Sequence, residues 1–145
     1  MVIRLAESDS EIMACFPAMR QLRTHLAAEQ DFLARVRRQQ RQGYLLAFVE
    51  QQGRAVCVAG FRLLENLPWG RFVYVDDLVT DETARSHGHG EAMMNWLIDY
   101  ARREDCDEFH LDSGVQRFAA HRFYLNQRMD ITSHHFAIRL KERRG

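Results

Sequence analysis

The chain has 145 residues with 20 basic and 20 acidic side chains, so its formal net charge is zero. This length suits a single domain over residues 1–145, and the charge balance excludes a wholesale electrostatic attraction to nucleic acid. No apolar run approaches the roughly 18 residues that a membrane-spanning helix needs, so no membrane segment is expected.

The three cysteines also bear on the compartment. Cys15, Cys57 and Cys106 are odd in number and far apart in the sequence. Neither a disulfide framework nor a zinc ribbon has this pattern. The N-terminal residues lack the form of a signal peptide. We therefore expect a cytoplasmic protein.

The first 43 residues predict a strand followed by helices. Ser8 and Glu11 form a capping box that begins a helix. Pro17 interrupts the apolar periodicity of that helix and should kink or split it. The expected elements are a strand over residues 2–5, a helix whose apolar face extends from Ile12 to Leu26, and a second helix over residues 29–42.

The remaining chain alternates strands and helices. The turn at residues 51–53 joins two β-prone segments into a hairpin. A third strand follows the loop at residues 66–70 and leads into a glycine-containing segment. The expected elements are strands over residues 44–50, 54–64, 71–80, 108–112 and 131–140, a helix that ends near Glu104, and a short helix over residues 116–126.

This order predicts an α/β fold with a mixed sheet. Short turns make the middle strands antiparallel, whereas the strand–helix–strand unit over residues 71–112 should be a right-handed parallel crossover. The expected architecture is a mostly antiparallel sheet of six to seven strands, with helices on both faces.

The most informative stretch follows the third middle strand and reads Arg-Ser-His-Gly-His-Gly-Glu over residues 85–91. Gly88 and Gly90 allow another molecule to approach the backbone closely. The first N–H groups of the next helix have no internal partner and lie at the positive end of its dipole. The segment is therefore predicted to bind one or two phosphate groups, although a plain glycine turn would give the same glycines.

The strand before this segment carries two acidic residues. Strand alternation puts Tyr74, Asp76 and Leu78 on one face and Val75 and Asp77 on the other, unless a bulge exchanges the faces. Both aspartates could instead bind structural partners, or attract a cationic molecule without moving a proton.

Together these features resemble the GNAT acetyltransferase superfamily over nearly the whole chain. The loop sequence R-S-H-G-H-G matches the family pattern Q/R-x-x-G-x-G/A, and V-D-D-L-V-T-D precedes it at the family's spacing. The stretch S-G-V-Q-R-F-A-A-H-R-F-Y is similar to the family's last helix and its tyrosine. The resemblance implies acetyl-CoA as the donor and a primary amine as the acceptor.

The resemblance also implies roles for individual residues. The backbone of Leu78, Val79 and Thr80 would pair with the pantetheine arm of acetyl-CoA. The amine would attack the thioester directly, with Asp76 as the base, Asp77 as the runner-up and Tyr124 as the acid that protonates the leaving sulfur. The pyrophosphate would be bound by the loop residues Arg85, Ser86, His87, Gly88, His89, Gly90 and Glu91.

Three positions depart from the family pattern. Arg128 stands where a glycine usually closes the last helix, and a left-handed non-glycine residue costs roughly 1 kcal/mol. Arg117 replaces a common asparagine and could reach a phosphate of coenzyme A. His87 and His89 fill the free loop positions, and we expect both side chains to stay in solvent.

Other functions compete with amine acetylation. The same loop would suit a catalytically inactive acyl-CoA-binding sensor or regulatory module. The arginines of the second predicted helix, Arg35, Arg37, Arg38 and Arg41, could instead bind an acidic partner. No histidine pair has zinc-ligand spacing, so no metal is expected. A homodimer is expected only because many relatives pair.

Overall fold

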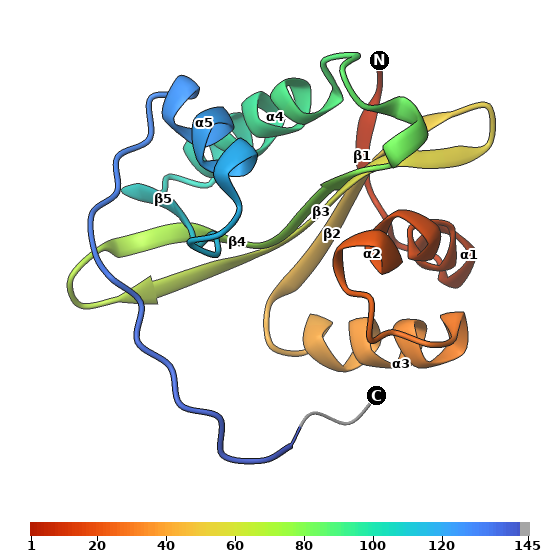
Figure 1. The fold of residues 1–145 in the computed structure, drawn as a ribbon, viewed down its shortest axis with the longest axis horizontal. Helices are drawn as coiled ribbons and strands as arrows, with labels where there is room; N and C mark the ends of the chain where they lie inside the picture. The colour runs from red at the N-terminus through yellow and green to blue at the C-terminus, as the bar shows by residue number, and fades with distance from the viewer. Residues whose placement is uncertain (143–145) are drawn as a thin grey trace.

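The computed structural model describes residues 1–142, which form one five-stranded sheet with helices on both faces (Figure 1). The strands are adjacent in the order β1-β2-β3-β4-β5. Their bounds are β1 Ile3–Leu5, β2 Tyr44–Gln51, β3 Arg54–Asn66, β4 Gly70–Thr80 and β5 Glu108–Leu111, and the helices are α1 Asp9–Ala14, α2 Phe16–Leu22, α3 Glu29–Gln40, α4 His89–Arg103 and α5 Phe118–Asn126, with a short 3₁₀ helix η1 over Glu82–Ala84.

The first helix begins where the local sequence predicts, and it is interrupted at the predicted proline, but it ends earlier than expected. The Ser8 hydroxyl accepts the Glu11 N–H at 3.1 Å, and the Glu11 carboxylate accepts the Ser8 N–H at 3.0 Å, so the capping box is formed. Pro17 splits the predicted helix into α1 and α2, because its ring fits only the first turn of a helix. The helix ends at Leu22, and Leu26 is buried from the following irregular segment.

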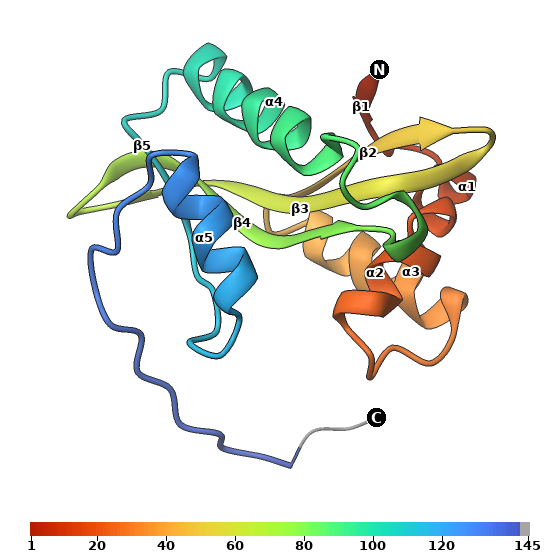
Figure 2. The ribbon, with the colours of Figure 1, turned by 45° about the horizontal axis from the view of Figure 1, so that its top comes forward.

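Two apolar cores lie on opposite faces of the sheet. Helices α1 to α3 cover one face and α4 covers the other (Figure 2). On the α4 side, Met93 and Leu97 lie one turn apart and pack against strand residues such as Val73, as the helical periodicity predicts. The first four strands are antiparallel, and β4 and β5 pair in parallel through the α4 crossover. The predicted fold class is therefore confirmed.

The predicted strand over residues 131–140 is absent, which makes the sheet smaller than the six to seven strands expected. Residues 129–142 form no helix or strand, and every residue from 130 to 142 is exposed. A strand requires a neighbour that accepts and donates its backbone hydrogen bonds. This segment continues away from α5 without pairing with its own sheet (Figure 1).

Candidate active site

The paired strands β4 and β5 separate midway along β4. Their parallel pairing extends from Phe72 opposite Glu108 to Val75 opposite Leu111, where β5 ends. Strand β4 continues to Thr80 and pairs there only with β3. The backbone groups of residues 76–80 that face away from β3 therefore have no strand partner within residues 1–142. An extended molecule can pair with such an edge as an added strand.

The loop after β4 presents a row of free donors beside this edge. Across residues 1–142, no group accepts a hydrogen bond from the backbone N–H of any residue from 85 to 91. Ser86 has φ +68° and Gly88, the N-cap of α4, has φ +79°. Left-handed residues at alternate positions allow successive N–H groups to converge on one anion. The loop and the positive end of the α4 dipole are suited to bind phosphate.

A buried aspartate supports the start of this loop. The Asp81 carboxylate accepts hydrogen bonds from the Thr83 N–H and hydroxyl at 2.9 and 2.7 Å, and it pairs with Arg54 at 2.9 Å. The Thr83 hydrogen bonds hold the pKa of Asp81 below its ordinary value. Arg85 turns back so that its Nε lies 3.4 Å from the Thr80 carbonyl oxygen. The loop is therefore anchored at its first turn.

The expectation that both loop histidines stay in solvent is half wrong. His87 is exposed, but His89 is 2% exposed. Position 89 is the first residue of α4, whereas position 87 precedes the helix. Neither ring nitrogen of His89 has a protein partner within the described residues.

The two aspartates of β4 lie on the same face of the sheet, contrary to simple alternation. Asp77 is opposite Gly60 and Val75 is opposite Phe61, so Asp76 is the extra residue of a β-bulge. The bulge shifts the later residues by one position. Asp77 therefore joins Asp76 on the face covered by α1 to α3, and Leu78 moves to the α4 face.

Asp77 is held by two partners. Its carboxylate accepts hydrogen bonds from Arg23 Nε and from the Tyr44 hydroxyl, each at 2.8 Å. Burial, followed by the Asp77 charge, raises the pKa of Tyr44 far above its ordinary value. The close packing requires glycine at position 60, because a Cβ there would overlap the Tyr44 hydroxyl and lie 2.7 Å from the Asp77 carboxylate.

Asp76 is more accessible than Asp77, with 24% of its side chain exposed against 13%. Its carboxylate accepts a hydrogen bond from Arg62 Nε at 2.8 Å. Burial raises the pKa of Asp76, and the Arg62 contact opposes part of that rise. The charge of Asp77 raises it further, although by less. Such a carboxylate accepts a proton more readily than an ordinary aspartate does.

Both aspartates line an open cleft of about 500 Å³ on the α2–α3 side of the sheet. Tyr74 and Asp112 also line it, and burial and the Asp112 carboxylate raise the pKa of Tyr74. Arg35 also lines the cleft and pairs with Asp31 at 2.9 Å, while Arg37 pairs with Asp9. Two arginines of the predicted basic cluster are therefore partly neutralised.

Tyr124 lies on α5, on a different element from the aspartates. Within residues 1–142, no group hydrogen-bonds its hydroxyl, and burial raises its pKa. Its neighbour Phe123 lies near Gly90 and close to Thr80, since a Cβ at Gly90 would be 3.6 Å from the Phe123 ring and 3.8 Å from the Thr80 hydroxyl. The helix therefore packs beside the glycine-containing loop that precedes α4. Tyr124 does not line the 500 Å³ cleft.

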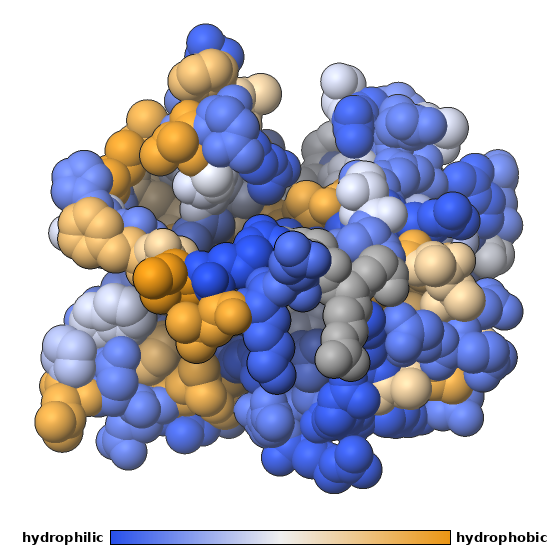
Figure 3. All heavy atoms as spheres, turned by 60° about the horizontal axis from the view of Figure 1, so that its bottom comes forward, coloured by the Kyte–Doolittle hydropathy of each residue, from blue (hydrophilic) through white to orange (hydrophobic). Residues whose placement is uncertain are grey.

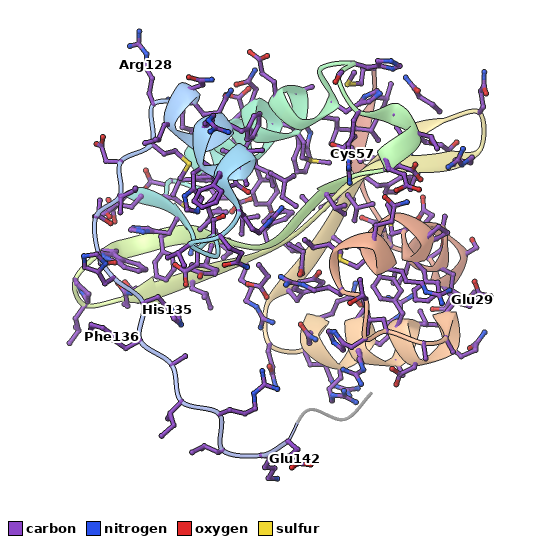
Figure 4. All side chains as sticks on the ribbon, in the orientation of Figure 1. Glu29, Cys57, Arg128, His135, Phe136 and Glu142 are labelled. Atoms are coloured by element: carbon purple, nitrogen blue, oxygen red, sulfur yellow. The ribbon has the colours of Figure 1, made fainter. Side chains whose placement is uncertain are left out.

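Arginines lie at both ends of α5, at positions where helices usually have other residues. Arg117 is the N-cap of α5 and is exposed. Arg128 has φ +66°, so the helix ends in the left-handed conformation that glycine normally adopts. The Arg128 side chain points away from the body of the molecule (Figure 4). Arg128 therefore ends the helix in a backbone conformation that is strained for a residue other than glycine.

Sequence reasoning missed the groups that position the aspartates. Arg23 and Tyr44 come from segments far from β4 in the sequence, and no local motif marks them. Gly60 was detectable in principle, since an isolated glycine within a strand often marks a bulge or a close approach. Within residues 1–142, no group of three or more His, Cys, Asp or Glu side chains is placed to hold a metal ion, and no helix is long and apolar enough to cross a bilayer.

Comparison with known proteins agrees with this geometry. The model of the acetyltransferase (GNAT) family matches residues 7–129. The uncharacterised N-acetyltransferase YhdJ of Bacillus subtilis (strain 168) is 35% identical over 123 residues, which cover 83% of this chain and 84% of the relative.

Solved structures share the fold at lower identity. The ribosomal-protein-alanine N-acetyltransferase of Brucella melitensis biovar Abortus 2308 superimposes with a TM-score of 0.82 at 16% identity, over 97% of this chain and 100% of the other. Glucosamine-6-phosphate N-acetyltransferase of Arabidopsis thaliana gives a TM-score of 0.76 at 17% identity, with the same coverage. The chain belongs to the acetyltransferase (GNAT) family and is an N-acetyltransferase.

Proposed function

We propose that this protein transfers an acetyl group from acetyl-CoA directly to a primary amine. One observation carries the proposal: beyond the free edge of β4, the backbone N–H groups of seven successive residues, 85–91, have no partner within residues 1–142. A thioester donor with an extended amide-containing arm and a pyrophosphate needs a strand edge followed by an anion site. The two lie in that order along the chain.

The donor would be bound mainly by backbone groups. The edge formed by Leu78, Val79 and Thr80 would pair with the pantetheine amides, and the N–H groups of residues 85–91 would bind the pyrophosphate. Arg117 is exposed at the start of α5 and is free to reach a further phosphate. Because most of these contacts are made by the backbone, the side chains of His87 and Glu91 can vary without loss of the site.

The acceptor would bind in the cleft lined by Asp76 and Asp77. The Asp77 carboxylate accepts hydrogen bonds from Arg23 and Tyr44, so Asp77 would form part of the cleft wall and would not act as the base. Asp76 has a raised pKa and remains partly accessible, so it would take the proton of the ammonium group, directly or through water. The Asp112 carboxylate adds to the negative potential that attracts a cationic amine.

The transfer balances with three proton movements. Asp76 first takes one proton from the ammonium group and passes it to solvent, and the neutral amine nitrogen then attacks the thioester carbonyl carbon. The nitrogen loses a second proton as the amide forms, and that proton replaces, through solvent, the one that Tyr124 gives to the leaving sulfur. The C–S bond then breaks, and the thiolate of coenzyme A takes a proton from the Tyr124 hydroxyl. Tyr124 is protonated at neutral pH, burial raises its pKa further, and its hydroxyl has no protein partner within the described residues that would compete for that proton. Tyr124 and Asp76 therefore act on different atoms from different elements.

A titration of acetyl-CoA into the purified protein tests the donor site. Gly88→Glu places a carboxylate among the N–H groups and should abolish binding. Gly53→Glu is the matched control, because Gly53 has φ +76°, close to the +79° of Gly88, and both positions open into free space. Loss of binding in both variants, or in neither, would contradict the assignment.

A screen of primary amines with detection of free coenzyme A thiol tests the reaction. Release of thiol that depends on the amine supports transfer. Binding of acetyl-CoA without release for any amine class would favour the sensor alternative. We place the enzyme in the cytoplasm, since its three cysteines are free thiols.

A further inference from the structure

The acceptor cleft contains positively charged side chains as well as aspartates. Among its lining residues, Asp76, Asp77 and Asp112 lie on β4 or directly after β5, whereas Arg23 and Arg35 come from the helices on that side of the sheet. A cleft that receives only a cationic amine gains from the carboxylates and loses from the guanidinium groups. The amine alone therefore does not account for the arginines.

Arg23 has partners within the fold. Its Nε donates to the Asp77 carboxylate and its Nη2 donates to the Asp76 carbonyl oxygen, each at 2.8 Å. Because Arg23 is the C-cap of α2, the two hydrogen bonds fasten the end of that helix to β4. Its charge is thus used to hold the two aspartates in place.

Arg35 has no such partner in the cleft. Its Nε donates at 2.9 Å to Asp31, which lies one turn earlier on α3 and is 51% exposed. An exposed pair of this kind contributes little to stability. Within residues 1–142, no group accepts a hydrogen bond from either terminal nitrogen, Nη1 or Nη2, of Arg35. The end of its guanidinium group therefore keeps its donors for another molecule.

The position of Arg35 on α3 also directs it to the cleft. Phe32 and Val36 are each 4% exposed and belong to the core, so their side of α3 faces inward. Arg37 and Arg38 do not line the cleft. Figure 3 shows that the surface around α1 to α3 is mostly hydrophilic, so arginines on the outer side of α3 are ordinary there. The residues of α3 that line the cleft recur at intervals of three and four, and they form one stripe of the helix: Phe32, Arg35, Val36 and Gln39.

Part of the cleft lining is apolar. Leu26 and Phe32 line the cleft and are 6% and 4% exposed. The cleft volume of about 500 Å³ is typical of a site for a whole small molecule. A molecule that complements this lining has an amine for the aspartates, an anionic group for Arg35 and apolar atoms between the two.

We propose that the acceptor is an amino acid with an apolar body, whose amine is received by Asp76 and whose carboxylate is bound by the terminal nitrogens of Arg35. A planar guanidinium group binds a carboxylate through two parallel hydrogen bonds. Arg35 would thereby hold the acceptor by its unreactive end while the amine reaches the thioester. A polyamine would instead place a second ammonium group beside Arg35, where like charges repel. The inference rests on the proposed function for the transfer step, but not for the binding of the amino acid.

Matched pairs of acceptors test the role of the carboxylate. Phenylalanine is compared with phenethylamine, and glycine, β-alanine, γ-aminobutyrate and ε-aminocaproate are each compared with the alkylamine that lacks only the carboxylate. Free coenzyme A thiol is the readout. The best acceptor should be an amino acid whose kcat/KM exceeds that of its matched amine by at least about 10-fold. If every amine is turned over as well as its amino acid, this inference fails and the proposed function stands.

Variants at position 35 test whether Arg35 causes that preference. Arg35→Gln should remove most of it, and Arg35→Lys, which keeps the charge but not the fork, should retain part of it. The matched control is Arg38→Gln, which makes the same charge change at an exposed position of the same helix and should keep the full preference. Arg35→Glu should reverse the preference, so that cadaverine becomes a better acceptor than ε-aminocaproate. A wild-type preference that survives in Arg35→Gln would refute the assignment.

A binding measurement separates this inference from the transfer reaction. The same pairs are titrated calorimetrically into the protein, with and without coenzyme A. The preferred amino acid should bind at least about 10-fold more tightly than its matched amine, and Arg35→Gln should abolish the difference. That result without release of thiol would contradict the proposed transfer and support the amino-acid site. Equal binding of both members of every pair would refute the site, whether or not any amine is acetylated.

Discussion

Gly60→Ala tests the packing that holds the two aspartates in place. The added Cβ would overlap the Tyr44 hydroxyl and lie 2.5 Å from its Cζ atom and 2.7 Å from the Asp77 carboxylate. Tyr44 is 4% exposed and its hydroxyl donates to Asp77, so the ring cannot move away from the new Cβ without losing that hydrogen bond. The substitution must therefore displace the Tyr44 hydroxyl from Asp77.

The expected cost follows from two contributions. Losing a hydrogen bond to a charged partner costs about 1.5–3 kcal/mol, and overpacking of a well-packed core adds about 1–3 kcal/mol. Because Arg23 still neutralises Asp77 and is partly exposed, some relaxation is available. We expect the free energy of unfolding to fall by about 3 kcal/mol on these grounds, measured by urea denaturation.

A double-mutant cycle with Tyr44→Phe provides the control. Phenylalanine lacks the hydroxyl that meets the new Cβ, so Gly60→Ala should cost at least about 1 kcal/mol less in that background. An equal cost in both backgrounds would refute the proposed overlap. So would a cost below about 0.5 kcal/mol in the wild type, which is the range of surface substitutions.

Three further predictions follow from the site and the last helix. Tyr124→Phe should lower kcat by about 10–10³-fold and leave the Kd of acetyl-CoA unchanged; a change confined to Kd would argue against an acid role. The folded state raises the pKa of Asp76, so its stabilising contribution is full below the ordinary value of 3.8 and is lost as pH rises through the raised pKa. Asp76→Asn should therefore weaken the fall in stability over that interval, while it lowers turnover at neutral pH, as pH-dependent denaturation and rate profiles will check. Arg128→Gly should raise the free energy of unfolding by about 1 kcal/mol, whereas Arg128→Ala, which keeps the strained φ, should leave it nearly unchanged.

The spacing of residues along the sequence was enough to predict the family, but not the role or the face of each site residue. The spacing of Asp76, Gly88 and Tyr124 leads to a GNAT resemblance, and the family itself is confirmed. Their individual roles remain predictions. Alternation along β4 gave the wrong face for Asp77, because a bulge depends on how the partner strand β3 is registered.

Other features that depend on contacts between distant segments could not be predicted from the sequence either. The predicted strand at residues 131–140 has a suitable pattern, but a pattern cannot say whether a partner edge lies within reach in the same chain. The burial of His89 likewise depends on which side of α4 meets the sheet. Arg23 reaches Asp77 across 54 positions of sequence, a contact that only the folded chain can make.

The sequence by itself determined the features that depend on neighbours within about four residues: the Ser8 capping box, the split at Pro17, the hairpin turn and the glycine turn that begins α4. Caps and turns are closed by local hydrogen bonds and local backbone angles, so their signals are contained in a short window. The tertiary structure alone decided the face of Asp77, the partners of both aspartates and the unpaired state of residues 131–140. Strand register, burial and edge pairing are set by contacts between distant segments, whose free energy no local window contains.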